Sequence, residues 1–332
     1  MGFITRYGSF WGSIPETSGR IFWVAPAASY TVEGRSYSAS DNNDGLSPER
    51  ALLTLDYAVG LCTANVGDVI VMLPGAHSYS SAVAADVAGI TITGIPATNT
   101  KANLRMPLGG KKRVATIVNT ATAAITSAII TVTAADVEIA NLTFLPVAAG
   151  GQGIQVRDGS ARCYIHDCIF AMVATASVTT YGIHAPLASA LTTAEDITIS
   201  HCYFVSGTTA ASGANGAGVA ALGTVYNMVI ENSTFELKGA IAAWADAIKS
   251  DGTASFGLII RDVDFVASAS PTALITECID TSGGMVLDGS TTALRCMFPL
   301  HSVGLQATAA LDTLSAECYV ANSAGGSLVS VT

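Results

Sequence analysis

Lys249 lies in a stretch of the sequence that could support acid–base chemistry. Asp246 precedes it, and Asp251 and Asp280 follow it. A lysine can remove a proton when nearby acids hold the substrate, and paired carboxylates can hydrolyse a sugar linkage. The same residues have a plainer interpretation, since an exposed lysine beside an aspartate is ordinarily an ion pair worth less than about 1 kcal/mol. We therefore predict an ion pair and no catalytic residue. If the protein is an enzyme, these four residues are the catalytic candidates.

The elements that would position these residues repeat along the chain. An isoleucine stands five positions before a phenylalanine in five segments, and the successive phenylalanines are 26, 34, 31 and 30 residues apart. Each segment alternates apolar and polar residues, which indicates strands rather than helices. Repeated strand units of this length predict a solenoid, in which stacked coils share one core. The phenylalanines are Phe144, Phe170, Phe204, Phe235 and Phe265.

One position of the repeat is always Asn, Asp or His, and we predict a structural row at a turn there rather than a polar site. The row consists of Asn141, Asp167, His201, Asn232 and Asp262. Cys168 and Cys202 also share a repeat position, which predicts an inward row of small core side chains. The seven cysteines include no CxxC pair, and His166, His184 and His201 lack ligand-like pairing. The sequence therefore predicts no metal and no cofactor.

A second series marks another strand in each coil, with pairs such as Gly182-Ile183 and Ala247-Ile248. Counting one position past each pair predicts that Lys249 and Asp280 are neighbours on adjacent coils, about 4.8 Å apart. The full row is Gln155, His184, Ala220, Lys249 and Asp280. The third strand of each coil has no comparable marker.

Composition limits the partners of this chain. Only 12% of its residues are charged, the net charge is −10 and the mean hydropathy is +0.48. No apolar run reaches the roughly 18 residues that a membrane span needs. High hydropathy without a span favours an oligomer, and we predict a homotrimer. Residues 101–113 carry five basic residues and no acid, but without interleaved aromatics they do not predict nucleic-acid binding. This basic segment is either a solvated loop or a segment that docks on an acidic partner.

The first 35 residues are rich in aromatic side chains, including Phe10, Trp11, Phe22 and Trp23. Such residues are favoured interface anchors, so the segment predicts an arm that attaches the protein to a partner. A cap over the first coil is the alternative. The start of the sequence also lacks the basic and apolar pattern of a secretory signal, which predicts synthesis in a cytoplasm without a cleavable leader.

A motif after this segment carries a family resemblance. Asp41-Asn-Asn-Asp-Gly-Leu-Ser-Pro48 is followed by a helical pattern over residues 48–60 and by Gly67-Asp-Val-Ile-Val-Met-Leu-Pro-Gly75. This order resembles the opening of right-handed parallel β-helix proteins of the pectate-lyase-like superfamily. The resemblance implies an all-β solenoid with a short helix plugging its first coil. The superfamily includes polysaccharide lyases, glycosidases and epimerases as well as phage tailspikes and other virion proteins. Its lyases use a base beside acidic groups that neutralise a uronate, sometimes through a calcium ion.

We therefore predict three parts: an attachment arm or cap over residues 1–35, a parallel β-helix over 36–300, and a C-terminal cap or trimerisation segment over 301–332. The predicted function is a structural virion protein of a phage, a capsid decoration or spike whose partners are other capsid or tail proteins. The alternatives are a tailspike lyase or glycosidase acting on a surface polysaccharide, and a non-catalytic adhesin that binds a surface glycan.

Overall fold

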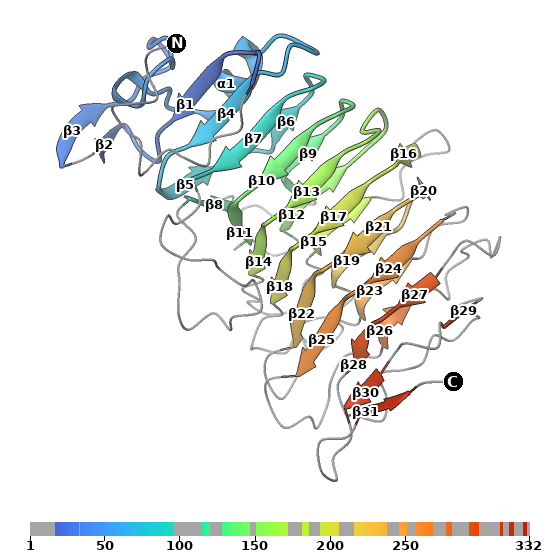
Figure 1. Ribbon diagram of the computed structural model, residues 1–332. Coiled ribbons are helices and arrows are strands. Elements are labelled where there is room, and N and C mark those ends of the chain that lie inside the picture. Colours follow the sequence, from blue (N-terminus) through green and yellow to red (C-terminus); the bar gives the residue numbers. More distant parts are fainter. Residues whose placement is uncertain are drawn as a thin grey trace.

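The computed structural model describes residues 17–32, 34–95, 115–119, 128–146, 151–171, 181–185, 193–205, 216–237, 246–250, 257–267, 277–280, 292–298, 313–314, 319–321 and 328–330. These residues form a right-handed parallel β-helix, as predicted, with three sheets running along one stack of coils (Figure 1). Every pair within the three sheets is parallel except the last, β30 with β31.

The first sheet contains the repeated isoleucines and is called the isoleucine sheet. Its strands are β1 (Ile21–Val24), β4 (Val69–Met72), β7 (Thr91–Gly94), β10 (Glu138–Ala140), β13 (Tyr164–His166), β17 (Thr198–Ser200), β21 (Val229–Glu231), β24 (Ile259–Arg261), β27 (Thr292–Leu294) and β29 (Thr313–Leu314).

The second sheet contains the repeated phenylalanines and is called the phenylalanine sheet. Its strands are β5 (Gly75–Tyr79), β8 (Ala115–Asn119), β11 (Leu142–Pro146), β14 (Ile169–Ala171), β18 (Tyr203–Val205), β22 (Thr234–Leu237), β25 (Asp264–Ala267), β28 (Met297–Phe298), β30 (Tyr319–Ala321) and β31 (Leu328–Ser330).

The third sheet contains the glycine series and is called the glycine sheet. Its strands are β6 (Val83–Ala85), β9 (Ala128–Val132), β12 (Gln152–Val156), β15 (Tyr181–Ala185), β19 (Ala217–Ala221), β23 (Asp246–Ser250) and β26 (Glu277–Asp280). A short parallel pair, β16 (Thr193–Glu195) with β20 (Thr224–Tyr226), lies at the corner that leads back to the isoleucine sheet.

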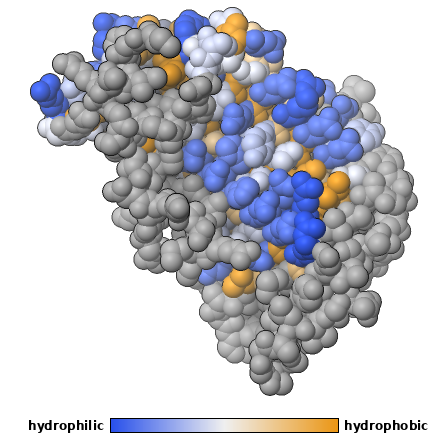
Figure 2. All heavy atoms as spheres, in the orientation of Figure 1, coloured by the Kyte–Doolittle hydropathy of each residue, from blue (hydrophilic) through white to orange (hydrophobic). Residues whose placement is uncertain are grey.

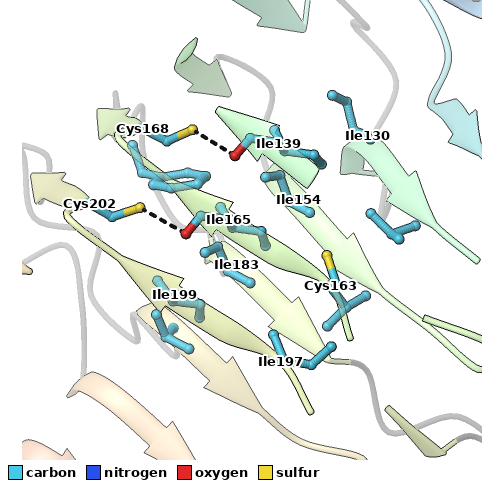
Figure 3. Packing of buried hydrophobic residues seen from close by; sticks show 14 of the residues in the cluster. Ile130, Ile139, Ile154, Cys163, Ile165, Cys168, Ile183, Ile197, Ile199 and Cys202 are labelled. Carbon is cyan, nitrogen blue, oxygen red and sulfur yellow. Dashed lines mark hydrogen bonds between the residues drawn. The ribbon is translucent and has the colours of Figure 1, made fainter. Parts of the chain in front are cut away.

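Like residues stack along the core from coil to coil. The five repeated isoleucines are fully buried, and the phenylalanine rings lie nearly parallel at centroid distances of 5.0, 4.8, 4.5 and 5.4 Å. Cys168 and Cys202 form the predicted inward row, and each thiol donates to a backbone carbonyl of the preceding coil, at 3.7 Å (Figure 3). Both cysteines are free and buried, so their role is packing.

The corner between the isoleucine and phenylalanine sheets explains the Asn/Asp/His row. All five residues have a left-handed backbone, with φ between 48° and 57°. Asn and Asp tolerate this conformation better than other residues that carry a side chain. Their backbone N–H groups bond to the next coil, as from Asp167 to the Ser200 carbonyl at 3.2 Å. The prediction of a structural turn row is confirmed.

A second left-handed row lies two residues before each strand of the isoleucine sheet from β4 to β24, and the sequence did not reveal it. Its side chains continue from coil to coil, since Arg162 pairs with Asp136 and Asn227 donates to Asp196 at 3.0 Å. The row consists of Gly67, Gly89, Asp136, Arg162, Asp196, Asn227 and Gly257. Each three-residue strand between β10 and β24 is therefore bounded by a left-handed residue on both sides.

The start of the solenoid is plugged by a helix, as expected. The pattern over residues 48–60 forms two pieces, the 3-10 helix η2 (Pro48–Arg50) and α1 (Leu55–Leu61). They separate because Thr54 is extended and caps α1, accepting a bond from the Tyr57 N–H. Asp41 holds this cap by accepting bonds from the Leu53 and Thr54 N–H groups. The helix buries Leu55, Ala58 and Val59 in the main core.

Candidate functional site

The outer side of the glycine sheet brings the candidate residues together. Its strands from β9 to β26 depart from strict alternation. In β9, β23 and β26 two consecutive residues, such as Ala247 and Ile248, both join the main core. In β12, β15 and β19 a glycine facing a phenylalanine ring takes the first of these two places. The residues on either side of that pair, three positions apart, therefore point outward. In β12 these are Gln152 and Gln155, whose side chains hydrogen-bond at 3.4 Å. In β23 they are Asp246 and Lys249.

The strand register places the predicted constellation on neighbouring coils. Lys249 is the partner of Asp280, and Asp246 is the partner of Glu277, between β23 and β26. The predicted adjacency of Lys249 and Asp280 is thus found in the backbone. Asp246 is buried at 3% exposure, whereas Lys249 is half-buried, and both take part in side-chain interactions. Asp251 lies outside the described residues. The assignment of these residues to an ion pair rather than to catalysis stays a prediction, and the four remain the catalytic candidates.

Two coils before Asp246, the structure adds an aromatic and a histidine to this face. Tyr181 and His184 of β15 stack at a ring-centroid distance of 4.4 Å. The His184 Nδ1 donates to the Gln152 Oε1 at 3.0 Å, and the same oxygen accepts from Gln155. Gln152 and Tyr181 were missed because a period-two pattern places them on the opposite face from Gln155 and His184.

His184 has the properties of a neutral acceptor. Burial and the charge of Arg157 lower the pKa of His184 to about 4, so the ring is uncharged at pH 7. With Nδ1 donating to Gln152, Nε2 carries the lone pair, and this buried atom has no hydrogen-bond partner among the described residues. Chemically, the position can accept a hydrogen bond or a proton.

The outer face of the isoleucine sheet carries a second polar cluster, and Figure 2 shows hydrophilic residues along this face. His166 lies between two carboxylates, with Nε2 2.8 Å from Glu138 and Nδ1 2.8 Å from Asp167. Glu138 also accepts from Thr91 at 2.9 Å, so the cluster joins β7, β10 and β13. Burial opposes the charged ring, but the two carboxylates prevail and raise the pKa of His166 to about 9.

The aromatic residues predicted for attachment divide into two groups. Phe22 and Trp23 lie in β1, which pairs with β4, so the solenoid begins inside the segment predicted as an arm. Phe22 is 2% exposed in the main core. Trp23 is 7% exposed and packs on the other side of the sheet with Tyr30 of the hairpin β2 (Ser29–Val32) and β3 (Arg35–Ser38). Their burial gives both residues a packing role. Phe10 and Trp11 lie outside the described residues.

The described part of the chain lacks two features. It contains no cluster of three or more His, Cys, Asp or Glu residues that could hold a metal ion. None of its helices has the length and apolar character to cross a membrane. The basic segment 101–113 falls outside the described residues.

Comparisons with known proteins find likeness in structure but not in sequence. No protein-family model matches the chain, and no curated protein matches it. Similar solved structures include a pectin methylesterase variant in complex with a hexasaccharide, at 12% identity and a TM-score of 0.48, over 75% of both chains. Pectin methylesterase PemA from Erwinia chrysanthemi has 11% identity and a TM-score of 0.42, over 86% of this chain and 80% of its own. ORF18 of Geobacillus virus E2 has 11% identity and a TM-score of 0.34, over 73% of this chain and 53% of its own. Identities this low do not extend an activity to this chain, so its own residues have to decide the function.

Proposed function

We propose that this protein is a structural component of a phage particle, a trimeric β-helical spike or capsid decoration attached through its N-terminal segment. The observation that carries the proposal is that charged side chains on the described outer faces pair between neighbouring coils. Arg162 pairs with Asp136, Arg261 with Glu231 and Arg295 with Asp262, each pair one coil apart. Charges used in this way hold coils in register instead of converging on a substrate.

The regular core supports the same role. Stacked phenylalanine rings, an inward cysteine row and two rows of left-handed corners repeat the same contacts in successive coils. Each coil depends on its neighbours for a continuous core, which makes a solenoid a stiff, elongated unit. The phage assignment itself rests on the opening motif at Asp41–Gly75, which resembles a superfamily that includes virion proteins, and on the aromatic residues before it.

Location on the particle tests this proposal. Particles would be purified from the culture that produces the protein, and an epitope tag after Thr332 would be located by electron cryo-microscopy. Density on the capsid lattice or the tail supports the proposal. Particles that lack the chain, with all of it free in the medium, would contradict it. Sedimentation equilibrium of the recombinant protein tests the trimer, which requires three times the 33.7 kDa of one chain.

A second candidate function is cleavage of a surface polysaccharide on the outer side of the glycine sheet. The specific observation in its favour is the register that sets Lys249 opposite Asp280, with Asp246 on the same face. There, Lys249 would remove a proton and the carboxylates would orient the sugar.

The enzymatic candidate predicts that Lys249→Ala abolishes depolymerisation of the host's surface polysaccharide, measured by the release of reducing ends. Arg261→Ala, a change of similar charge on the isoleucine sheet, is the matched control and should keep full activity. If the wild-type chain releases no product from either acidic or neutral polysaccharides, this candidate is wrong.

A further inference from the structure

Tyr164 is an unusual side chain for the outside of this solenoid. Among the described residues, the exposed large hydrophobic side chains on coil strands are Tyr164, at 38%, and Val266, at 43%. The others lie near the N-terminal end. Tyr164 points outward because its neighbour Ile165 is fully buried in the core. An exposed aromatic ring offers a flat apolar surface with a polar end, which suits contact with a partly polar ligand.

The orientation of this ring is fixed before any ligand arrives. The Tyr164 ring stacks on His166 at a centroid distance of 4.2 Å. His166 is itself held at both ring nitrogens, by Glu138 and by Asp167. The Tyr164 hydroxyl also has a side-chain hydrogen bond with Ser200 of the next coil. A rigid platform loses little conformational entropy on binding, so more of the contact energy remains as affinity.

Hydrogen-bonding groups surround the platform on both sides along the stack. The register places Glu138 of β10 on one side of Tyr164 and Thr198 of β17 on the other. Both side chains are partly exposed. The carboxylate of Glu138 accepts one bond on each oxygen, from Thr91 and His166, and each oxygen has a further lone pair. The rim therefore offers acceptors and a hydroxyl to a ligand rich in O–H groups.

The local charge selects against strongly ionic ligands. Three carboxylates act on Tyr164, those of Asp167, Glu231 and Glu138. Glu138 and Asp167 both pair with the charged His166 ring, and Glu231 pairs with Arg261. The face is thus close to neutral with a slight negative excess, which disfavours uronates and other anionic sugars and leaves little attraction for a polycation.

We propose that the outer face of the isoleucine sheet at Tyr164 binds a neutral saccharide, whose ring packs on Tyr164 while its hydroxyls bond to Glu138 and Thr198. This site is separate from Lys249 and its carboxylates, which lie on the glycine sheet. A saccharide site here goes beyond the structural role, because it makes the side of the spike an adhesive surface. Saccharide binding at Tyr164 requires neither catalysis nor attachment of the protein to a particle.

The full recombinant chain, fluorescently labelled, would be applied to an array of neutral, acidic and basic glycans, and the best neutral ligand would then be titrated by calorimetry. Tyr164→Ala should lower affinity about tenfold, which corresponds to about 1.4 kcal/mol. Tyr164→Trp should keep binding, since it preserves an aromatic surface. Tyr57→Ala removes a tyrosine that is 43% exposed on α1, away from this face, and should change affinity less than about twofold.

Thermal unfolding of each variant shows whether the chain remains folded. Binding of acidic glycans alone, no binding to the array, or equal losses in Tyr164→Ala and Tyr57→Ala would overturn the proposal. The location of the chain on particles is measured independently, so failure of the saccharide site leaves the structural proposal standing, and the reverse also holds.

Discussion

Individual histidines of this protein occupy opposite electrostatic environments. His166 lies between two carboxylates, and its pKa is raised to about 9 despite partial burial. His77 and His184 are buried with no acidic partner among the described residues, and burial lowers the pKa of each to about 4. Their contributions to stability therefore change with pH in opposite directions, and each can be isolated by one substitution.

The His166 cluster should stabilise the fold up to mildly alkaline pH. Because the folded pKa lies above the unfolded value of 6.5, the stabilisation is complete below pH 6.5 and is lost as pH rises through about 9. We expect a loss of about 1 to 2 kcal/mol, since the Asp167 side chain is 39% exposed and solvent screens the pair. Urea unfolding at pH 7 and pH 10 measures it. His166→Gln should remove most of the difference between the two pH values, and an unchanged difference would contradict the assignment.

The buried histidines should destabilise the fold in acid. Each has a folded pKa below the unfolded value, so the stabilisation present above pH 6.5 is lost as pH falls through about 4. The expected cost is about 2 to 3 kcal/mol per histidine. The double variant His77→Gln/His184→Gln cannot gain these protons, so its free energy of unfolding should fall less between pH 6.5 and pH 4. A parallel fall in both proteins would show that other groups control acid unfolding.

At the scale of strands and corners, the sequence predicts those strands in which an apolar residue recurs at the same position of each coil. Phe144 and its equivalents mark one sheet, and their recurrence every 26 to 34 residues predicts the coil length and the cysteine row. The second series, with pairs such as Ala247-Ile248, predicts the neighbours of Lys249. The second left-handed row was not predictable in this way, because its members range from Gly67 to Arg162 and share only a backbone conformation. Gln152 and Tyr181 were missed for another reason, since two consecutive inward residues shift the alternation within the strand.

The glycines of the third sheet were read as strand starts, and the structure gives them a packing reason. A Cβ on Gly182 would lie 2.9 Å from the Phe204 Cδ1 and 2.5 Å from the Gly218 carbonyl oxygen. Gly182→Ala should therefore lower the free energy of unfolding by about 1 to 3 kcal/mol, because neither the ring stack nor the backbone can yield.

Gly60 is the matched control for this substitution. It lies in α1, and a Cβ there would meet nothing within 4 Å. Gly60→Ala should leave stability unchanged or raise it by up to about 1 kcal/mol, since alanine favours a helix. Chemical denaturation of the two variants compares them directly. Equal effects would mean that the ring stack tolerates a methyl group.

For the whole molecule, the central question is how the solenoid joins its partners. The described coils use their surface charges on one another, which leaves the ends and the uncharged areas for assembly. At the N-terminal end, Phe22 lies in the core and Trp23 lies beneath the β2–β3 hairpin, so neither is available to a partner. The predicted attachment role therefore passes to the residues before Thr17, which include Phe10 and Trp11.

Removing residues 1–16 should separate attachment from folding. β1 is held by its pairing with β4 and by the burial of Phe22 and Trp23, so we expect the truncated chain to unfold at the same temperature as the full chain and to keep its oligomeric mass. It should nevertheless be absent from particles assembled in its presence, as judged by immunoblotting of purified virions.

Trp23→Ala should have the opposite effects. It should lower the free energy of unfolding by about 3 to 5 kcal/mol by leaving a cavity under the hairpin, while the protein that remains folded still attaches to particles. Truncated protein on the particles would move the attachment site to another surface, and the open face around Tyr164 would be the next region to test.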